Sequence, residues 1–181
     1  MRISGGDLLR REIKTPKGND TRPTSGVVRE SIFNIIGNSV LDIRVLDLYS
    51  GSGAFGIEAI SRGAASCIFA EKEALPLKCI EKNLKTLKIE DKAEILKKNL
   101  PDQIKTIYCR ESFDLIFLDP PYSSNLLNKT LDEIRKTALA SDKTLIIAEH
   151  SKKEMPDSSF FQLLETRKYG KSLVSFFNCM L

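Results

Sequence analysis

From residue 43 onward, short apolar runs alternate with stretches whose apolar residues recur at helical spacing. The runs at 43–48, 66–70, 93–96, 113–118 and 144–148 predict five strands. The intervals between them, at 54–62, 74–87, 100–108 and 125–140, predict helices. Strands that alternate with helices form a mostly parallel sheet with helices on both faces. The chain is therefore predicted to adopt an α/β fold.

The two ends of the chain depart from this alternation. Residues 160–169 and 173–178 are separated by a short turn at Gly170 and predict an antiparallel hairpin, which brings the sheet to seven strands. Residues 1–23 are irregular or hairpin-like, with a turn signal at Gly5-Gly6, and a helix follows from Thr24 or Ser25 as its N-cap to a stop at Gly37. We expect a small basic extension over 1–38 and one larger domain over 39–181.

Composition excludes several classes of protein. The four cysteines are scattered, with no C-x-x-C pair, and His150 is the only histidine, so we expect no metal site. Lone cysteines in apolar surroundings are typical of core residues in a reducing compartment. No apolar run approaches membrane-spanning length and no signal segment opens the chain. We therefore expect a cytoplasmic protein with no membrane association.

The net charge of +4 is concentrated near the start of the chain. Seven Lys and Arg against four Asp and Glu leave +3 in residues 1–36 and only +1 in the remainder. A basic segment on a nearly neutral domain indicates a polyanionic partner, although a solvated terminal segment explains the charge equally well. The candidates for phosphate contact are Arg10, Arg11, Lys14, Lys17, Arg22 and Arg29.

A glycine-rich segment follows the first predicted strand. Gly51, Gly53 and Gly56 satisfy G-x-G-x-x-G between a strand and a helix, and Glu71 ends the next strand 20 residues after Gly51. This pattern is typical of dinucleotide binding, but Asp47, just before the turn, would repel a pyrophosphate. A cationic ligand with a ribose and no phosphate, such as S-adenosylmethionine, fits both acids better. An NAD(P)-dependent oxidoreductase is the alternative from another class.

The tetrapeptide Asp119-Pro120-Pro121-Tyr122 ends the fourth predicted strand. Proline has no N–H and restricts the residue before it, so the chain leaves the sheet stiffly with carbonyl oxygens and no amide donors beside them. Acceptors next to a flat ring suit a planar heterocycle with an exocyclic amino group, which stacks while its NH2 donates. The plainer interpretation is a Pro-Pro loop with an exposed acid.

Taken together and in order, these segments resemble the RsmD family, bacterial class I methyltransferases that methylate the N2 amino group of a guanine in 16S ribosomal RNA. The resemblance rests on residues 1–6, 22–25, 28–35, 45–54, 58–64, 114–122, 169–170 and 175–177. It implies a Rossmann-like class I methyltransferase fold, S-adenosylmethionine as cofactor, and 16S rRNA as substrate within a small-subunit assembly particle. We expect the protein to be a monomer. Gly26 and Tyr49-Ser50 depart from the family pattern without removing a group of chemical importance.

The resemblance implies a role for each residue of the site. Catalysis is expected from Asp119, Pro120, Pro121 and Tyr122. Cofactor binding is expected from Asp47, Ser50, Gly51, Gly53, Glu71, Asn99 and Asp119, with Asn99 holding the adenine amino group. His150, which follows the fifth predicted strand, is interpreted as a structural residue or one at the rim of the site. Methylation of adenine N6 or cytosine N4 on DNA or RNA suits the tetrapeptide equally well, and a non-catalytic RNA-binding protein of the same fold is a further alternative.

Overall fold

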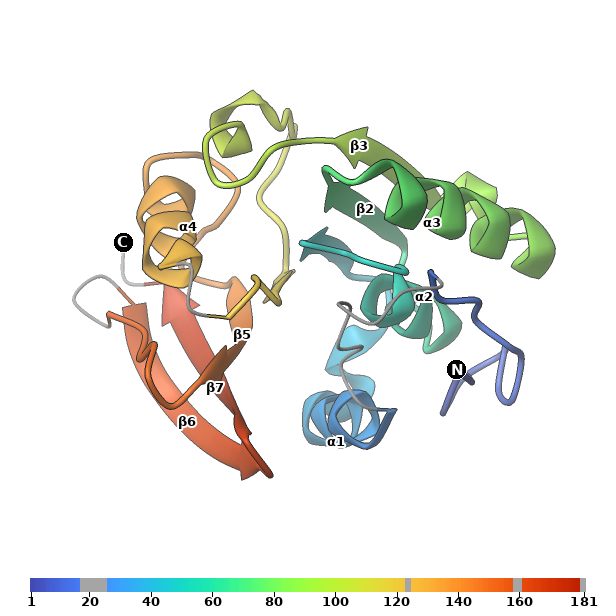
Figure 1. Cartoon of the computed structure of the whole chain (residues 1–181), viewed down its shortest axis with the longest axis horizontal. Helices are drawn as coiled ribbons and strands as arrows, with labels where there is room; N and C mark the ends of the chain where they lie inside the picture. The colour runs from blue at the N-terminus through green and yellow to red at the C-terminus, as the bar shows by residue number, and fades with distance from the viewer. Residues whose placement is uncertain (17–25, 123–124, 158–160, 180–181) are drawn as a thin grey trace. The chain divides into compact units, whose positions relative to one another are not determined.

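The computed structural model describes residues 1–16, 26–122, 125–157 and 161–179 (Figure 1). The chain forms two compact units, Met1–Lys97 and Lys98–Leu181, and each is described by itself. The division expected after residue 38 stays a prediction. Within the described ranges no helix has both the length and the apolar character needed to cross a bilayer. The same ranges contain no cluster of three His, Cys, Asp or Glu side chains suited to a metal ion.

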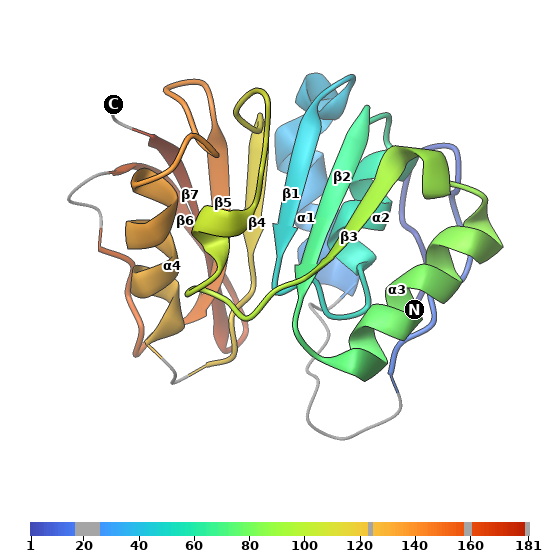
Figure 2. The same cartoon turned by 90° about the horizontal axis from the view of Figure 1, so that it is seen from above.

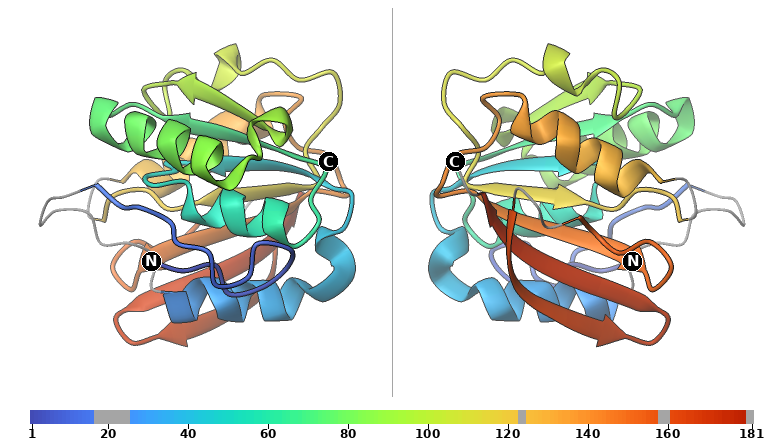
Figure 3. Two further views of the ribbon diagram at one scale, coloured as in Figure 1. Left: turned by 90° about the vertical axis from the view of Figure 1, so that its right-hand side faces the viewer. Right: turned by 90° about the vertical axis from the view of Figure 1, so that its left-hand side faces the viewer.

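The first unit is built on three parallel strands with β2 in the middle (Figure 2). They are β1 (Arg44–Leu48), β2 (Ser66–Glu71) and β3 (Ala93–Lys97). Its helices are α1 (Gly26–Ile36), α2 (Ala54–Ser61) and α3 (Ala74–Leu87), with short 3-10 turns at Gly37–Val40 and Glu90–Lys92. Helices α2 and α3 lie along the same face of these strands (Figures 1 and 3).

Helix α3 has the bounds that its sequence predicts. Leu77, Ile80, Leu84 and Leu87 recur at helical spacing and all four are buried. The chain ends the helix by adopting a left-handed conformation at Lys88, with a φ of 59°. This apolar stripe therefore both forms the helix and attaches it to the strands.

The first sixteen residues form a hairpin packed on α2, not a loose arm. The Ile3 N–H donates to the Arg11 carbonyl at 3.0 Å and the Arg10 N–H to the Ile3 carbonyl at 2.9 Å. At the turn, Gly6 has a φ of 77°, and a Cβ there would lie 1.8 Å from the Ser61 carbonyl oxygen. Only glycine fits so close an approach, which explains the Gly-Gly signal in the sequence. Within the hairpin, Ile3 and Ile13 are buried.

The second unit has the strand order β4-β5-β7-β6. Its elements are β4 (Leu115–Leu118), α4 (Leu126–Arg135), β5 (Leu145–Ser151), β6 (Phe161–Tyr169) and β7 (Ser172–Cys179). Strands β4 and β5 are parallel, whereas β7 runs antiparallel to both β5 and β6, which confirms the predicted hairpin (Figure 3). The register between β6 and β7 shifts between Leu163 and Glu165, and β6 is exposed over most of its length.

Two helix predictions in this unit need correction. Residues 100–108 do not form an α-helix, since only Ile104–Thr106 makes a 3-10 turn. Leu100, Ile104 and Ile107 are all buried, so their helix-like spacing reflects contact with the core and not a helical backbone. Helix α4 ends at Arg135, before the predicted residue 140. Its last turn tightens, because the Thr137 N–H donates to the Ile134 carbonyl three residues back.

Candidate active site

The glycine segment after β1 forms a loop that is tightly packed on one side and open on the other. Tyr49, Gly51 and Gly53 have φ values of 60°, 55° and 77°. A Cβ on Gly56 would lie 2.4 Å from the Phe69 ring, and one on Gly53 would lie 3.2 Å from Ile80. A Cβ on Gly51 would meet nothing closer than 4.0 Å. The loop is therefore pressed against the core at Gly53 and Gly56, and Gly51 is where a ligand can approach the backbone.

Asp47 supports this loop from the interior. It is 1% exposed, and its Oδ2 accepts the Gly56 N–H at 3.0 Å. Burial raises the pKa of Asp47 to about 7, the Gly56 N–H opposes that rise, and the negative charge of Glu71 adds to it. Because the carboxyl is partly protonated near neutral pH, the repulsion of a pyrophosphate is weaker than the sequence indicates.

Glu71, at the end of β2, joins the loop to the turn before α3. Its Oε2 accepts the Gly51 N–H at 3.0 Å, and its Oε1 accepts the N–H groups of Lys72 and Glu73 at 2.7 and 3.0 Å. An ionised carboxylate offers about four acceptor positions, so one remains beside Gly51. The carboxylate is fixed in place by backbone donors and can still accept a hydrogen bond from a ligand hydroxyl.

The other predicted cofactor residues differ in what they do. The Ser50 hydroxyl donates to the Asp47 carbonyl at 2.6 Å, so it holds the end of β1 in shape. Asn99 belongs to the second unit, where it is exposed and its N–H donates to the Gln103 side chain at 2.7 Å. Its contact with an adenine stays a prediction.

In the second unit, the tetrapeptide follows directly after β4. Pro120 is buried, and Asp119 and Tyr122 are half-buried. The Tyr122 hydroxyl donates to Glu149 Oε1 at 3.1 Å and shares a hydrogen bond with Ser172 Oγ at 2.8 Å. Burial raises the pKa of Tyr122 to about 12, with the charges of Glu149 and Asp119 adding to the rise and Ser172 opposing it. The phenol therefore stays protonated, and its ring is held in one orientation.

Sequence reasoning missed Glu149, which is the acid that holds Tyr122. Glu149 lies on β5, is 5% exposed, and has an Oε2 atom without a hydrogen-bond partner in the described part of the chain. Leu118 pairs with Ala148 across the parallel strands, so Asp119 and Glu149 are the next residues on neighbouring strands. The available signal is an acid directly after each of two consecutive predicted strands, Asp119 after 113–118 and Glu149 after 144–148.

His150 has a structural environment. It is 1% exposed, and its Nε2 lies 2.8 Å from Ser175 Oγ, which lies 2.8 Å from Thr166 Oγ1. Burial lowers the pKa of His150, so the ring is neutral at pH 7. The imidazole thus joins β5, β7 and β6, in agreement with the structural interpretation.

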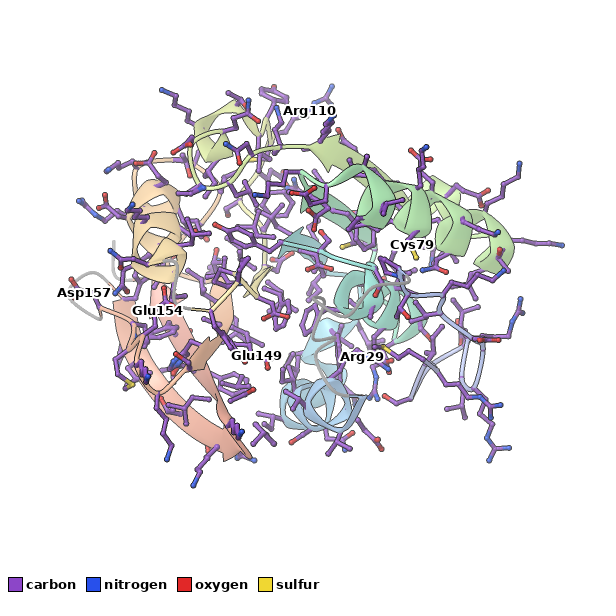
Figure 4. The ribbon with its side chains drawn as sticks, viewed as in Figure 1. Arg29, Cys79, Arg110, Glu149, Glu154 and Asp157 are labelled. Carbon is purple, nitrogen blue, oxygen red and sulfur yellow. The ribbon has the colours of Figure 1, made fainter. Side chains whose placement is uncertain are left out.

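The expectation that Arg29 contacts RNA phosphate is wrong. The side chain is 1% exposed, and its Nε lies 3.1 Å from Glu58 Oε2. Its guanidinium also donates to the Arg2 carbonyl at 2.5 Å. Figure 4 labels Arg29 among the side chains of α1 and α2. A buried guanidinium that is paired in this way stabilises the fold and cannot meet a phosphate at the surface.

The other basic candidates fall into two groups. Arg10, Arg11 and Lys14 are exposed on the hairpin, and Arg11 donates to the Thr86 carbonyl near the end of α3 at 3.3 Å. Their role in RNA binding stays a prediction. Lys17 and Arg22 lie outside the described residues.

Two proteins named as rRNA methyltransferases are similar to this chain over most of its length. A protein from Bacillus subtilis (strain 168) named "Putative rRNA methyltransferase YlbH" is 37% identical over 181 residues, which cover 98% of each chain. "Ribosomal RNA small subunit methyltransferase D" from Escherichia coli (strain K12) is 32% identical over 149 residues, or 82% of this chain and 74% of its own.

A solved structure extends the comparison to the fold. The structure named "Putative methyltransferase yhhF from Escherichia coli" matches with a TM-score of 0.85 and 28% identity, over 99% of this chain and 97% of its own. The likeness confirms the predicted class I methyltransferase fold, a mostly parallel seven-stranded sheet with a C-terminal antiparallel hairpin. The model of the family described as "Conserved hypothetical protein 95" matches residues 1–178. The chain therefore belongs to the Conserved hypothetical protein 95 family and has RsmD-like relatives.

Proposed function

We propose that this protein transfers a methyl group from S-adenosylmethionine to the exocyclic N2 amino group of a guanine in 16S ribosomal RNA. The observation that carries the proposal is the arrangement after β4. Asp119 and Pro120 come three and two residues before Tyr122, the charge of Asp119 acts on the Tyr122 phenol, and Glu149 and Ser172 hold the Tyr122 hydroxyl. An acid and a proline carbonyl next to an oriented ring suit a planar base that stacks while its exocyclic NH2 donates.

The relatives support the choice of substrate. The B. subtilis relative is named for rRNA and the E. coli relative for small-subunit ribosomal RNA. The exposed cations Arg10, Arg11 and Lys14 suit contact with a phosphate backbone. We propose that the protein acts as a monomer in the cytoplasm, on an assembling small subunit.

The residues of the first unit fit the proposed cofactor. Glu71 keeps an acceptor position for a ribose hydroxyl, Gly51 lets a ligand approach the backbone, and Asp47 offers negative charge to a cationic ligand once its proton is lost. When bound, S-adenosylmethionine supplies an activated methyl group and the sulfur leaving group. Asp119 and Asn99 are proposed to contribute further contacts.

The residues after β4 act on the nucleophile. The guanine amino nitrogen reacts poorly because its lone pair is delocalised into the ring. We assign the acceptance of its two N–H groups to the Asp119 carboxylate and the Pro120 carbonyl, which favours a lone pair localised on nitrogen. Stacking of the base on Tyr122 contributes about 1–3 kcal/mol. The base must first leave its own stack. The methylated nitrogen then loses one proton, which Asp119 can accept.

Mass spectrometry of small-subunit rRNA nucleosides tests the proposal, with RNA from cells that have or lack the protein. The expected difference is one 2-methylguanosine per subunit, restored when purified protein and S-adenosylmethionine are added to the deficient subunits. Appearance of N6-methyladenosine or N4-methylcytidine instead would assign the chain to the alternative reaction. Calorimetric binding of NAD(P) in preference to S-adenosylmethionine would favour the oxidoreductase.

A further inference from the structure

We propose that Glu149 accepts the N1–H of the target guanine through Oε2 and thereby selects guanine over adenine and cytosine. The inference rests on the proposed function, because it concerns the base that enters beside Tyr122. It assigns to Glu149 a base-recognition role that is separate from activation of the amino group by Asp119.

The position of Glu149 supports this role. Leu118 and Ala148 are register partners in parallel strands, whose backbones lie about 4.8 Å apart, and Asp119 and Glu149 are the next residues along the two strands. The charges of both acids act on the Tyr122 phenol. Glu149, labelled in Figure 4, is therefore part of the same cluster as the proposed catalytic residues.

The hydrogen bonds of Glu149 leave one oxygen for a ligand. Tyr122 donates to Oε1 at 3.1 Å, and Ser172 in turn holds the Tyr122 hydroxyl at 2.8 Å. These contacts fix the direction of the carboxylate. Oε2 is shielded from solvent and has no partner within the described ranges, although buried carboxylate oxygens are normally satisfied. A donor that arrives with the substrate would satisfy it once the side chains over it shift to admit the base.

The three bases that carry an exocyclic amino group differ at the neighbouring ring atom. In guanine, the N2 amino group stands beside N1–H, which is a donor. In adenine, N6 stands beside N1, and in cytosine N4 stands beside N3, and both of these ring nitrogens are acceptors. A carboxylate oxygen bonds to the donor of guanine and is repelled by the lone pairs of the other two. A site that needs a substrate N–H strongly rejects analogues that lack one.

The test measures methyl transfer to small subunits from cells that lack the protein, with products identified as nucleosides. The variant is Glu149→Gln, whose amide can donate to a ring acceptor. Two controls accompany it. Ser172→Ala removes a partner of Tyr122 without changing charge, and Glu165→Gln removes an exposed carboxylate on β6.

We expect Glu149→Gln to lower kcat/KM for guanine by about 10²–10³-fold, while S-adenosylmethionine binding is retained. The residual product should shift toward methylated adenine or cytosine. Ser172→Ala should lower the rate by less than about tenfold, in line with loss of one neutral hydrogen bond, and leave the product unchanged. Glu165→Gln should behave as wild type.

The outcomes separate this inference from the proposed function. If wild type forms 2-methylguanosine and Glu149→Gln keeps its rate and product, the inference is overturned and the proposed function stands. If wild type forms N6-methyladenosine, the proposed function is wrong, and so is the proposed recognition of the guanine N1–H by Glu149. Should Glu149→Gln melt well below wild type, wild type is given RNA carrying 1-methylguanosine at the target position. Unimpaired methylation of that RNA would overturn the inference, and loss of methylation would support it.

Discussion

The guanidinium of Arg29 and the carboxylate of Glu58 meet at 3.1 Å in the interior of the first unit, where neither side chain is more than 1% exposed. Glu58 also accepts the Ser4 N–H at 3.0 Å and the Arg62 Nε at 2.8 Å. One carboxylate on α2 therefore ties together the N-terminal hairpin, α1 and its own helix.

The first prediction concerns Glu58→Gln and the stability of the fold. Breaking a buried ion pair leaves uncompensated charge and destabilises a protein by about 3–5 kcal/mol. Urea unfolding should show a loss of that size. Asp132→Asn, which removes an exposed partner of Arg135 and Lys136, should leave stability close to that of wild type, because exposed ion pairs contribute little. Equal effects in the two variants would contradict the structural role of Glu58.

The same carboxylate predicts a dependence of stability on pH. Burial alone would raise the pKa of Glu58, but the donors Ser4 and Arg62 and the charge of Arg29 hold it below its usual value of 4.5. A lowered pKa in the folded state means that the stabilisation is complete above pH 4.5 and is lost as the pH falls through the lower value. Glu58→Gln should remove that part of the acid dependence, as measured by the unfolding midpoint in urea at each pH.

The second prediction separates catalysis from binding at Asp119. Asp119→Ala should lower methyl transfer by about 10²–10³-fold, because a polar contact to the reacting group is lost. Cofactor affinity measured by calorimetry should fall by no more than about tenfold, because the proposed cofactor contact of Asp119 is one among several. A loss of cofactor affinity as large as the loss of activity would make Asp119 mainly a cofactor or folding residue.

The third prediction concerns Glu71, whose carboxylate accepts three backbone N–H groups. Glu71→Ala should weaken S-adenosylmethionine binding by about 10–100-fold, the effect of losing a charged hydrogen-bond acceptor. Glu73→Ala is the matched control, because that side chain is 65% exposed. An unchanged thermal shift with S-adenosylmethionine in Glu71→Ala would show that the ligand binds elsewhere.

The fourth prediction follows from the pKa of about 7 at Asp47. The neutral carboxyl does not attract a cation, whereas the ionised carboxylate does, so S-adenosylmethionine should bind more tightly as the pH rises through 7. Because one proton is lost, the affinity for S-adenosylmethionine should rise by at most about tenfold per pH unit. Asp47→Asn should lack this gain, and comparison with it cancels the titration of the ligand itself. Parallel pH profiles for the two proteins would remove Asp47 from cofactor binding.

The fifth prediction tests the exposed cations of the hairpin. Reversing charge at Arg10 and Arg11 should weaken RNA binding and reduce the salt slope by about 0.7 for each lost contact with single-stranded phosphate. Reversal at the exposed Lys78 and Lys85 of α3 changes the net charge equally and serves as control. If both double variants lose the same affinity, the effect is one of net charge and the hairpin has no special role.

Local periodicity predicted the elements that pack through one continuous apolar face. The bounds of helix α3 were predicted to the residue because its apolar residues recur at helical spacing and are also the residues that the helix buries. Residues 100–108 carry similar spacing, yet only three of them form a 3-10 turn. Spacing records which side chains are buried, and an irregular segment can bury Leu100, Ile104 and Ile107 as well as a helix can.

The site was predictable where its residues form one local motif, as at residues 51–56 and 119–122. Arg29 was misassigned because its partner, Glu58, lies 29 positions away, and nothing in the sequence pairs them. Glu149 was missed for the same reason, since its bond to Tyr122 spans 27 positions. Contacts made by tertiary packing decide whether a charged residue faces a substrate or the core.

The shift in register between Leu163 and Glu165 bears on how copies of this protein meet. A regular, exposed edge strand that carries Leu163 and Leu164 would favour pairing with the edge strand of a second molecule. A register shift bends such a strand and interrupts the regular row of backbone N–H and C=O groups that a second strand would pair with. The register shift therefore disfavours edge-to-edge pairing through β6, although Leu163 and Leu164 are exposed on it.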